Sequence, residues 1–558
     1  MNNQKSTIDN QQSSAPHVGR DPVLVAAIAS AISLLSFLYY FHRGEILLYG
    51  DAVAHINIAR RVFDSQTPGL LQLGTVWLPL PHLLTLPFLI SNWMWRTGVG
   101  GSIPSMIAYV LGVLGIFRFT RDFLQDDLRD NERTRSSARA GAWLAALVYG
   151  ANANLIYLQA TAMTEPLYLA FFVWAVVYFA EFLRLSTSEL VDSSRWCRPL
   201  YRCALCLAGA ELTRYDGWFL AAAVGSAVLL LLRRRWNDRP FRAVAMKFLI
   251  GISVAPLLWF AYNAAVYGNP LEFANGPYSA KAIEKRTAQP GYPAHPGAGD
   301  VATAASFFLK SAQLNMAEGN WGRIWVVIAL AGSWAGMRNR ARRAVMLLWV
   351  PLLFYALSIA YSGVPLFLPT WWPFTWYNLR YGLQLLPLFA VSTGLMVAAM
   401  RSAGVFAYRF GPALVLAVVA LSYVSVWNSE PLCFKEAWVN SRSKLALESA
   451  VARAVAGLPR DSRYLMYIGD HVGVFQQAGI PLRQVVNEGN HRPGKKPSDP
   501  EGLWERALAD PGRHVDFVIG YDGDAVDQGV EKGGLTLVSE IQTPGQARAR
   551  IYDARRAR

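Results

Sequence analysis

The chain is short of charge and of cysteine, and each shortage narrows the class of protein. Charged residues make up 16% of its 558 residues, whereas a soluble globular domain has about 25%. Its four cysteines include one Cys-x-x-Cys pair, Cys203 and Cys206, with no second pair or nearby histidine to complete a metal site. The composition therefore argues against a soluble enzyme, a disulfide framework or a cysteine-based metal site, and it predicts small packed cysteines.

Apolar residues dominate instead, and they come in long runs. Hydrophobic residues account for 53% of the chain, and many runs of about 17–22 residues are long enough to cross roughly 30 Å of hydrocarbon. The net charge is +15, and the arginines cluster in short loops between the runs. That grouping indicates an integral, multi-pass membrane protein rather than a nucleic-acid-binding stripe. We therefore expect a lipid bilayer as partner and no nucleic acid.

The apolar runs predict an all-α transmembrane domain at 23–429, with the amino end in the cytoplasm and the carboxyl end outside. Its eleven spans are expected at about 23–41, 103–119, 141–159, 166–183, 201–213, 217–232, 236–266, 322–337, 344–361, 381–400 and 411–427. The first span lacks a small-residue cleavage pattern and should stay as an anchor. Residues 1–22, which are mostly polar, are expected to form a disordered cytoplasmic tail. The stretch between the seventh and eighth spans, rich in Gly, Pro and Ala, is expected to be a long outer loop.

The segment 78–95 is apolar enough to pass for a further span, but the topology argues against it. Six arginines between 118 and 139 mark the following loop as cytoplasmic. Only one crossing can then separate that loop from the outer end of the first span, and 103–119 supplies it. Three prolines in 78–95 would break a long helix. The segment is therefore predicted to be interfacial or re-entrant, within a first outer loop at 42–102.

Residues 430–558 have the composition of a small soluble domain, which this topology places outside the membrane. Short strands are expected at 464–468, 515–519, 535–541 and 549–552, and helices near 471–478 and 501–509. This alternation predicts an extracytoplasmic α/β domain. The sequence shows no internal repeat of the kind that many transporters carry.

Tyr49-Gly50-Asp51 begins a stretch in the first outer loop with the pattern of an amphipathic helix. With Asp51 as its cap, the 3.6-residue period puts Asp51 and His55 on one side. The same period groups Val53, Ile56, Ala59 and Phe63 in an apolar stripe and turns Asn57, Arg61 and Asp64 to water. The pattern predicts a helix lying on the membrane surface with a carboxylate at its positive end. A plain N-cap would explain Asp51 equally well.

Several ionisable residues fall at the outer ends of spans or in outer loops. They are Asp51, His55, Glu165, Arg214, Asp216 and Arg380. Each has an ordinary alternative, such as an ion pair or a snorkelling side chain, and Thr164-Glu165-Pro166 is also a common helix start. Their gathering on one face nevertheless indicates a site for a lipid-linked phosphate. Guanidinium groups bind phosphate in a bidentate manner, and a carboxylate can act as base when the leaving group is already a phosphate.

Five short motifs carry a resemblance to a known family. They are Gly50-Asp51-Ala52, the Pro-rich Trp77–Pro81, Thr164-Glu165-Pro166-Leu167, Leu212–Gly217 and Arg380-Tyr381. In order and topology they resemble the GT-C glycosyltransferases over about residues 23–400, and most of all the branch with protein mannosyltransferases and lipid A aminoarabinose transferases.

The resemblance implies an inverting transferase of the cell envelope, in a bacterial plasma membrane, with Asp51 as catalytic residue. The donor would be a polyprenyl-phosphate sugar, and the acceptor an extracytoplasmic protein, lipid or glycan. Many relatives have a second acid directly after this Asp, where this chain has Ala52. Because of that departure, His55, Glu165 or Asp216 would have to assist Asp51, and the sequence gives no support for a metal or other cofactor. Arg214 and Arg380 are expected to bind the donor phosphate.

Two other functions fit parts of the pattern. A transporter or flippase of an anionic substrate would need charged residues deep within spans, and most spans here have no charged residue in their central part. A non-catalytic scaffold would use the outer domain to bind a partner.

Overall fold

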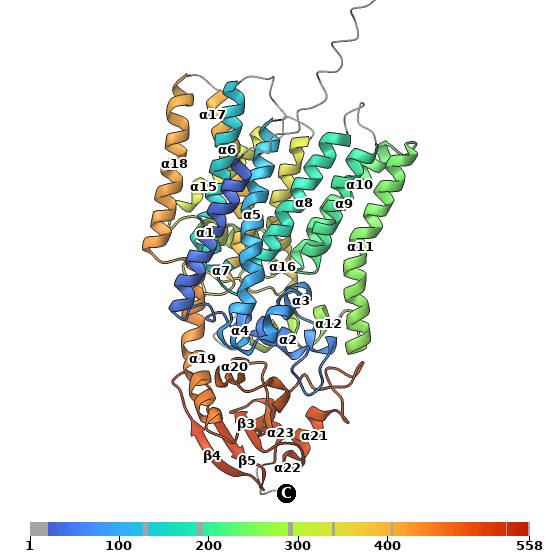
Figure 1. The fold of residues 1–558 in the computed structure, drawn as a ribbon, viewed down its shortest axis with the longest axis vertical. Helices are drawn as coiled ribbons and strands as arrows, with labels where there is room; N and C mark the ends of the chain where they lie inside the picture. The colour runs from blue at the N-terminus through green and yellow to red at the C-terminus, as the bar shows by residue number, and fades with distance from the viewer. Residues whose placement is uncertain are drawn as a thin grey trace, which may run out of the picture.

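The fold, seen in a computed structural model, is a bundle of long helices with a small mixed domain at one end (Figure 1). The structure describes residues 20–125, 132–186, 193–287, 294–336, 341–402, 405–531 and 533–555. The tail expected at 1–22 lies almost wholly outside the described residues.

In the part of the chain that the structure describes, eleven helices run along the bundle. They are α1 (Asp21–His42), α5 (Val99–Gln125), α6 (Glu132–Gly150), α8 (Glu165–Ser186), α9 (Ser193–Glu211), α10 (Asp216–Arg234), α11 (Arg239–Tyr267), α15 (Gly322–Gly336), α16 (Val350–Ser362), α17 (Leu386–Ser402) and α18 (Val405–Asn428). Within the described residues, eight helical segments are long and apolar enough to cross a membrane. A ninth results if α6 and α7 (Ala153–Gln159), bent by 60°, count as one span. The chain is thus a multi-pass membrane protein.

Two of the eleven expected spans do not pass that test. α9 carries three arginines in its first half, and α15 has 15 residues. Both still lie within the bundle, because α9 packs along α8 and α11 while α15 packs along α17. The charge of α9 and the length of α15 therefore explain why fewer helices than expected qualify as spans. Both helices lie at the positions in the chain where the apolar runs predicted them.

The segment at 78–95 is broken into short pieces beside the end of the bundle. These are α3 (Leu80–Thr85), the 3₁₀ helix η3 (Leu86–Ile90) and α4 (Asn92–Thr97). None reaches the length of a span, as predicted. Prolines stand at the first turns of α3 and η3, where they start new helices rather than continue old ones.

The stretch expected as a long outer loop connects α11 to α15 and is partly helical. It holds α12 (Glu272–Asn275), α13 (Ala280–Thr287) and α14 (Val301–Leu314). Asp300 caps α14 by accepting from the backbone N–H groups of Ala302 and Thr303. The helix then buries Phe307 and Phe308 and packs on α16. Tertiary packing therefore stabilises a helix that the surrounding Gly and Pro residues obscured.

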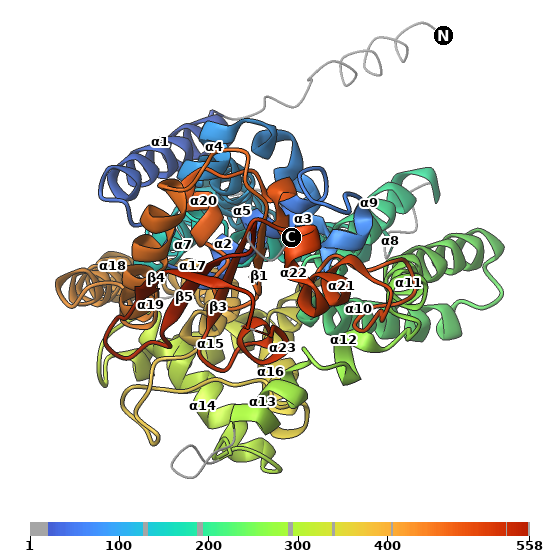
Figure 2. The same cartoon turned by 90° about the horizontal axis from the view of Figure 1, so that it is seen from below.

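Helix α19 (Leu432–Ala456) leads into the domain at the end of the bundle and was not predicted from the sequence. The sheet of this domain has the order β2-β1-β3-β5-β4. The strands are β1 (Tyr464–Met466), β2 (Val485–Val486), β3 (Phe517–Tyr521), β4 (Thr536–Ile541) and β5 (Ala549–Asp553). β1 runs parallel to β2 and β3, and β5 is antiparallel to its neighbours. Four strands and the helices α20 (Val474–Ala478) and α21 (Leu503–Ala509) match the expected ones. Figure 2 shows this domain lying across the end of the bundle.

Helix α2 (Gly50–Arg61) lies between the bundle and this domain rather than on an open membrane surface. Asn57, expected to face water, is buried and donates to Gln476 of α20 at 2.7 Å. Asp64 is also buried and accepts from Arg60 and from backbone N–H groups at 482 and 483. Phe63, expected in the apolar stripe, is exposed. Val53, Ile56 and Ala59 are buried, as the apolar stripe predicted. The expected polar face was wrong, because the C-terminal domain covers that side of the helix.

Candidate active site

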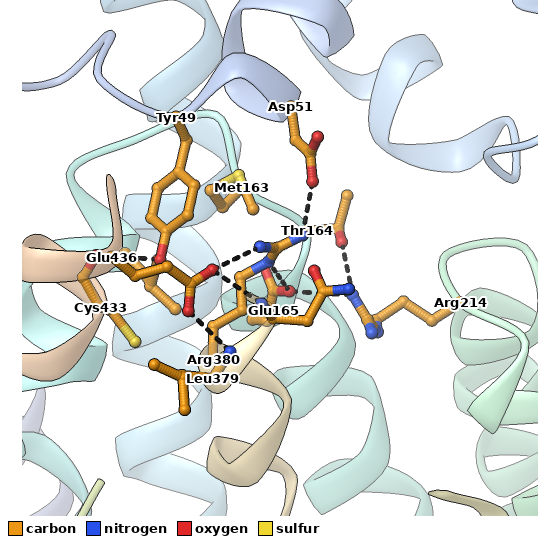
Figure 3. A network of polar contacts seen from close by, with 12 residues as sticks. Tyr49, Asp51, Met163, Thr164, Glu165, Arg214, Leu379, Arg380, Cys433 and Glu436 are labelled. Atoms are coloured by element: carbon orange, nitrogen blue, oxygen red, sulfur yellow. Dashed lines mark hydrogen bonds and ion pairs between the residues drawn. The ribbon is translucent and has the colours of Figure 1, made fainter. Parts of the chain in front are cut away.

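A buried arginine joins acids from three distant segments at the domain end of the bundle (Figure 3). Arg380 lies in the 3₁₀ helix η5 (Leu379–Leu385). Its guanidinium donates to Asp51 Oδ2 at 2.5 Å, to Glu165 Oε1 at 3.1 Å and to Glu436 Oε1 at 3.0 Å. The pairs link α2, the first turn of α8 and α19 to η5. Three carboxylates around one guanidinium accept one hydrogen bond from each of its three nitrogens and fix its plane.

Glu436 was not foreseen from the sequence. It also accepts from the backbone N–H groups of Asn378 and Leu379, at 3.1 and 2.6 Å. Asn378 has φ +57°, a left-handed conformation that needs support from its surroundings. Glu436 therefore both pairs with Arg380 and holds the turn that presents it. The sequence offers one weak signal, an acid within ten residues of the end of the last apolar run.

Arg214 forms the second half of the network. Its guanidinium donates to Glu165 Oε1 at 3.0 Å, to Tyr355 Oη at 2.8 Å and to Thr164 Oγ1 at 3.1 Å, and approaches Asp216 Oδ2 at 3.5 Å. Glu165 thus bridges the two arginines. The Tyr381 ring lies 4.9 Å from the Arg214 guanidinium and 5.2 Å from that of Arg380, within cation–π range.

Asp51 does not cap its helix, and the expected cap was wrong. α2 begins at Gly50, and Tyr49 stands at the cap position without a side-chain hydrogen bond. The Asp51 side chain is 38% exposed, whereas those of Glu165 and Glu436 are at most 1% exposed. Among the carboxylates paired with Arg380, Asp51 is therefore the one that a substrate can reach.

Two cavities meet at Asp51. The main cavity, of about 670 Å³, is lined by His55, Arg214, Asp216 and Arg380 and, farther from the domain, by side chains of α10 and α16. Phe219 and Tyr361 in that wall are exposed on the outside of the bundle, where lipid would cover them. The narrow cavity, of about 180 Å³, lies toward α19 and is more polar, with Asn440, Lys444 and Glu448 in its wall. A molecule in one cavity and a molecule in the other would both touch Asp51.

His55 lines the main cavity and pairs with a second buried histidine. Its Nδ1 lies 2.9 Å from Nε2 of His82 in α3, and its ring packs on Trp77 at 4.7 Å. Burial lowers the pKa of His55 to about 3 and that of His82 well below its usual range, so both rings are neutral. His82 was not foreseen, and its place in the Pro-rich stretch gave no chemical signal.

The surroundings of His82 decide which ring donates. Nδ1 of His82 is buried without a hydrogen-bond partner, and a bare acceptor there costs less than an orphaned N–H. The proton of His82 therefore sits on Nε2 and is donated to Nδ1 of His55. His55 then carries its own proton on Nε2. In this arrangement His55 is a hydrogen-bond donor for the main cavity, not a base.

Lys281 of α13 also lines the main cavity and was missed by the sequence reading. It is exposed and forms no ion pair within the described part of the chain. Arg214 and Arg380, by contrast, face four carboxylates in all, those of Asp51, Glu165, Asp216 and Glu436. Lys281 is therefore a cation still available to an anionic group.

The described residues contain no cluster of three or more His, Cys, Asp or Glu side chains that could hold a metal ion. All four cysteines are free thiols, and Cys203 and Cys433 are buried.

No family model and no curated protein sequence matches the chain. Solved structures do match it over most of its length. A crystal structure of ArnT from Cupriavidus metallidurans bound to undecaprenyl phosphate is 12% identical, covers 95% of this chain and 97% of its own, and has a TM-score of 0.53. The oligosaccharyltransferase AglB from Archaeoglobus fulgidus, in complex with an inhibitory peptide and a dolichol-phosphate, is 11% identical over 90% of this chain and 69% of its own, with a TM-score of 0.51. Both are GT-C glycosyltransferases, and this chain has their fold.

Proposed function

From this GT-C fold, we propose that the protein is an inverting glycosyltransferase that moves a sugar from a polyprenyl-phosphate donor to an acceptor outside the cytoplasm. The acceptor would be a protein, a lipid or a glycan. One observation carries the proposal: the accessible carboxylate of Asp51 lies where the main and narrow cavities meet, held by Arg380. The solved structures of the same fold that hold undecaprenyl phosphate or dolichol-phosphate support the class of donor.

In the proposed reaction Asp51 acts as general base. One carboxylate oxygen takes the proton of an acceptor hydroxyl while that hydroxyl oxygen attacks the anomeric carbon from the face opposite the phosphate. The bond between the anomeric carbon and the phosphate oxygen breaks, and its electron pair stays on the phosphate. Arg380 orients the base through its short contact with Oδ2, which leaves Oδ1 for the acceptor.

The leaving phosphate would lie in the main cavity. Arg214 and Lys281 line that cavity and supply positive charge, and the Nε2–H of His55 supplies a neutral donor. Because the two arginines already face four carboxylates, Lys281 would provide the charge that favours an incoming phosphate over water. The apolar wall of α10 and α16 would take the first units of the polyprenyl chain.

The orientation follows from the same proposal. The domain end of the bundle would face the outside of a bacterial plasma membrane, and the arginine-rich end the cytoplasm. Ala298, an exposed residue before α14, suits a test, since Ala298→Cys should react with an impermeant thiol reagent added outside intact cells. Labelling from the inside alone would contradict this orientation.

We further propose that transfer needs no metal ion. The residue after Asp51 is Ala52, and the neighbouring acids Glu165 and Glu436 already bond to Arg380. Excess chelator should therefore leave the transfer rate unchanged, and a loss restored by added Mg²⁺ or Mn²⁺ would overturn this point.

The decisive test is transfer of radiolabelled sugar by purified protein in nanodiscs. Synthetic polyprenyl-phosphate sugars serve as donors, and membrane and cell-wall extracts as sources of acceptor. We expect label in the acceptor, free polyprenyl phosphate and inverted anomeric configuration. Movement of the intact donor between the leaflets of liposomes, without cleavage, would instead establish the transporter function.

A further inference from the structure

A second large cavity borders α2, between the first outer loop and the outer domain. Its volume is about 600 Å³, close to that of the main cavity. We call it the aromatic cavity, because its wall contains Trp77, Tyr267, Tyr278, Tyr467 and Trp504. The three tyrosines and Trp77 are partly exposed, so a ligand in the cavity can contact them.

Polar side chains stand among these rings with their bonding capacity unfilled. Nε of Arg61 and Oε1 of Gln72 are both buried without a hydrogen-bond partner, and Gln72 as a whole is 2% exposed. Lys496 is 8% exposed and donates from Nζ to the carbonyl oxygen of Leu71 at 2.8 Å. Burial lowers the pKa of Lys496 to about 7 and raises the pKa of Glu488. Buried polar atoms left unpaired cost free energy, so the wall is suited to a polar ligand that pairs with them.

The mixture of groups narrows the chemistry of that ligand. A lipid tail would leave Arg61, Lys496 and Glu488 buried without new partners. A simple anion would meet the Glu488 carboxylate. A sugar ring presents an apolar face to an aromatic ring and a rim of hydroxyls that both donate and accept. Five aromatic rings around a cation pair, an amide and a carboxylate therefore fit a saccharide.

Helix α2 lines both the aromatic cavity and the main cavity. Ala54, Ile58 and Arg61 line the aromatic cavity, and Asp51 and His55 line the main cavity; residues three or four apart are neighbours on a helix, so the two cavities border adjacent strips of α2. Val76 and Trp77 belong to both walls. A chain of sugars seated in the aromatic cavity would therefore reach the neighbourhood of Asp51 by passing Trp77.

We propose that the aromatic cavity binds a saccharide chain, which is the acceptor of the glycosyl transfer. The proposal rests on the proposed function for the role of acceptor, but binding of the saccharide can be measured without any donor.

The test uses the full-length protein in nanodiscs and measures binding of short, fluorescently labelled oligosaccharides of glucose, mannose and arabinose. A mixed-sequence peptide of similar size is the competing probe. Lys496→Met and Tyr267→Ala remove one polar and one aromatic side chain from the cavity wall. Lys495→Met is the matched control, because Lys495 is the neighbouring residue and is exposed. Thermal unfolding of each variant establishes that it is folded.

We expect at least one oligosaccharide to bind and the peptide not to bind. Both cavity variants should weaken binding by about tenfold or more, while Lys495→Met binds as the parent does. In a transfer assay the same variants should raise the acceptor KM and leave the donor KM unchanged.

Other results would overturn the proposal. They are binding of the peptide alone, binding of none of the saccharides, or saccharide binding that folded Lys496→Met and Tyr267→Ala leave unchanged. Saccharide binding that depends on these residues, in a protein that transfers no sugar, would support the site and refute the glycosyltransferase function.

Discussion

The two ends of the helical bundle hold their charges in opposite ways. At the domain end, Arg380 pairs with acids that lie 329, 215 and 56 residues away along the chain, and its side chain is 7% exposed. At the other end, Arg118 pairs with Asp122 and Glu181, Arg121 pairs with Asp122, and Arg139 pairs with Asp21; the arginine side chains in these pairs are 30–66% exposed. Exposed pairs contribute little to stability, whereas buried ones are costly to desolvate. The difference indicates that topology accounts for the arginines at one end, and a site for those at the other.

The largest contrast between the ends should come from Asp51→Asn. The variant keeps the shape of the side chain but cannot accept a proton, so turnover should fall by about 10²–10⁴-fold. Folding should be affected less than by loss of Glu436, because Asp51 is 38% exposed and the asparagine oxygen can still accept a hydrogen bond from Arg380. Initial rates of sugar transfer measure the effect, with Arg139→Gln from the other end as control. A folded Asp51→Asn protein that transfers at the parental rate would end the catalytic assignment.

Removing an acid should also destabilise the protein much more at the domain end than at the other end. Glu436→Ala removes one partner of buried Arg380 and the acceptor for two backbone N–H groups. Breaking a buried pair in this way costs about 3–5 kcal/mol. Asp21→Ala, at the exposed pair, should barely change the unfolding temperature. Thermal unfolding in detergent, followed by tryptophan fluorescence, compares them, and equal shifts would contradict the contrast.

The cations of the main cavity should matter for the donor. A charge-assisted contact to phosphate contributes roughly 1.5–3 kcal/mol, so Arg214→Ala should raise the donor KM by about ten- to a hundred-fold. Lys281→Ala should act in the same direction and to a smaller extent, because its exposed charge is screened. Lys285→Ala is the matched control, one turn along α13 and outside the cavity wall. If the donor KM were unchanged in both Arg214→Ala and Lys281→Ala, the two residues would have no role in binding the donor phosphate.

The smallest effect is expected from the pair His55 and His82, which should make the stability of the protein depend on pH. The folded pKa of His55 is about 3 against an ordinary value of 6.5, so between these values the unfolded chain binds more protons than the folded one. Stability is therefore fully present above about pH 6.5 and falls as the pH drops toward 3. Unfolding temperatures across that range measure the slope, and His82→Leu should reduce it.

His82→Gln separates positioning from packing. The glutamine amide can still donate to Nδ1 of His55, so His82→Gln should retain a transfer rate that His82→Leu loses by about tenfold. Equal rates in the two variants would mean that His82 only fills space.

The positions of the spans could be predicted because length and hydropathy are local properties. The runs at 23–41 and 166–183 became α1 and α8, since each is long enough to cross a bilayer by itself. The buried strands β1 and β3 were also predicted, because their apolar runs are continuous. β2 was not predicted, because two residues are too few to show a periodic pattern. α19 was not predicted, because its sequence lies where the composition changes from that of a membrane domain to that of a soluble one.

The candidate site was predictable only in part, and for a related reason. Counting spans was enough to expect Asp51, Glu165, Arg214, Asp216 and Arg380 at one end, and the structure brings these five into one network. Their pairing was not predictable, because it depends on contacts between segments hundreds of residues apart. Glu436, His82 and Lys281 lie in stretches without any chemical signature, and each gains its environment from a neighbouring element.

The sequence by itself determined that this chain spans a membrane many times and gathers acids and arginines at one end, since apolar length and loop charge act locally. The tertiary structure alone decided which face of α2 meets solvent. The periodicity of α2 predicted water at Asn57, and docking of the C-terminal domain buried it against Gln476. The same docking enclosed the aromatic cavity beside Asp51, because a cavity wall forms only when distant segments pack together.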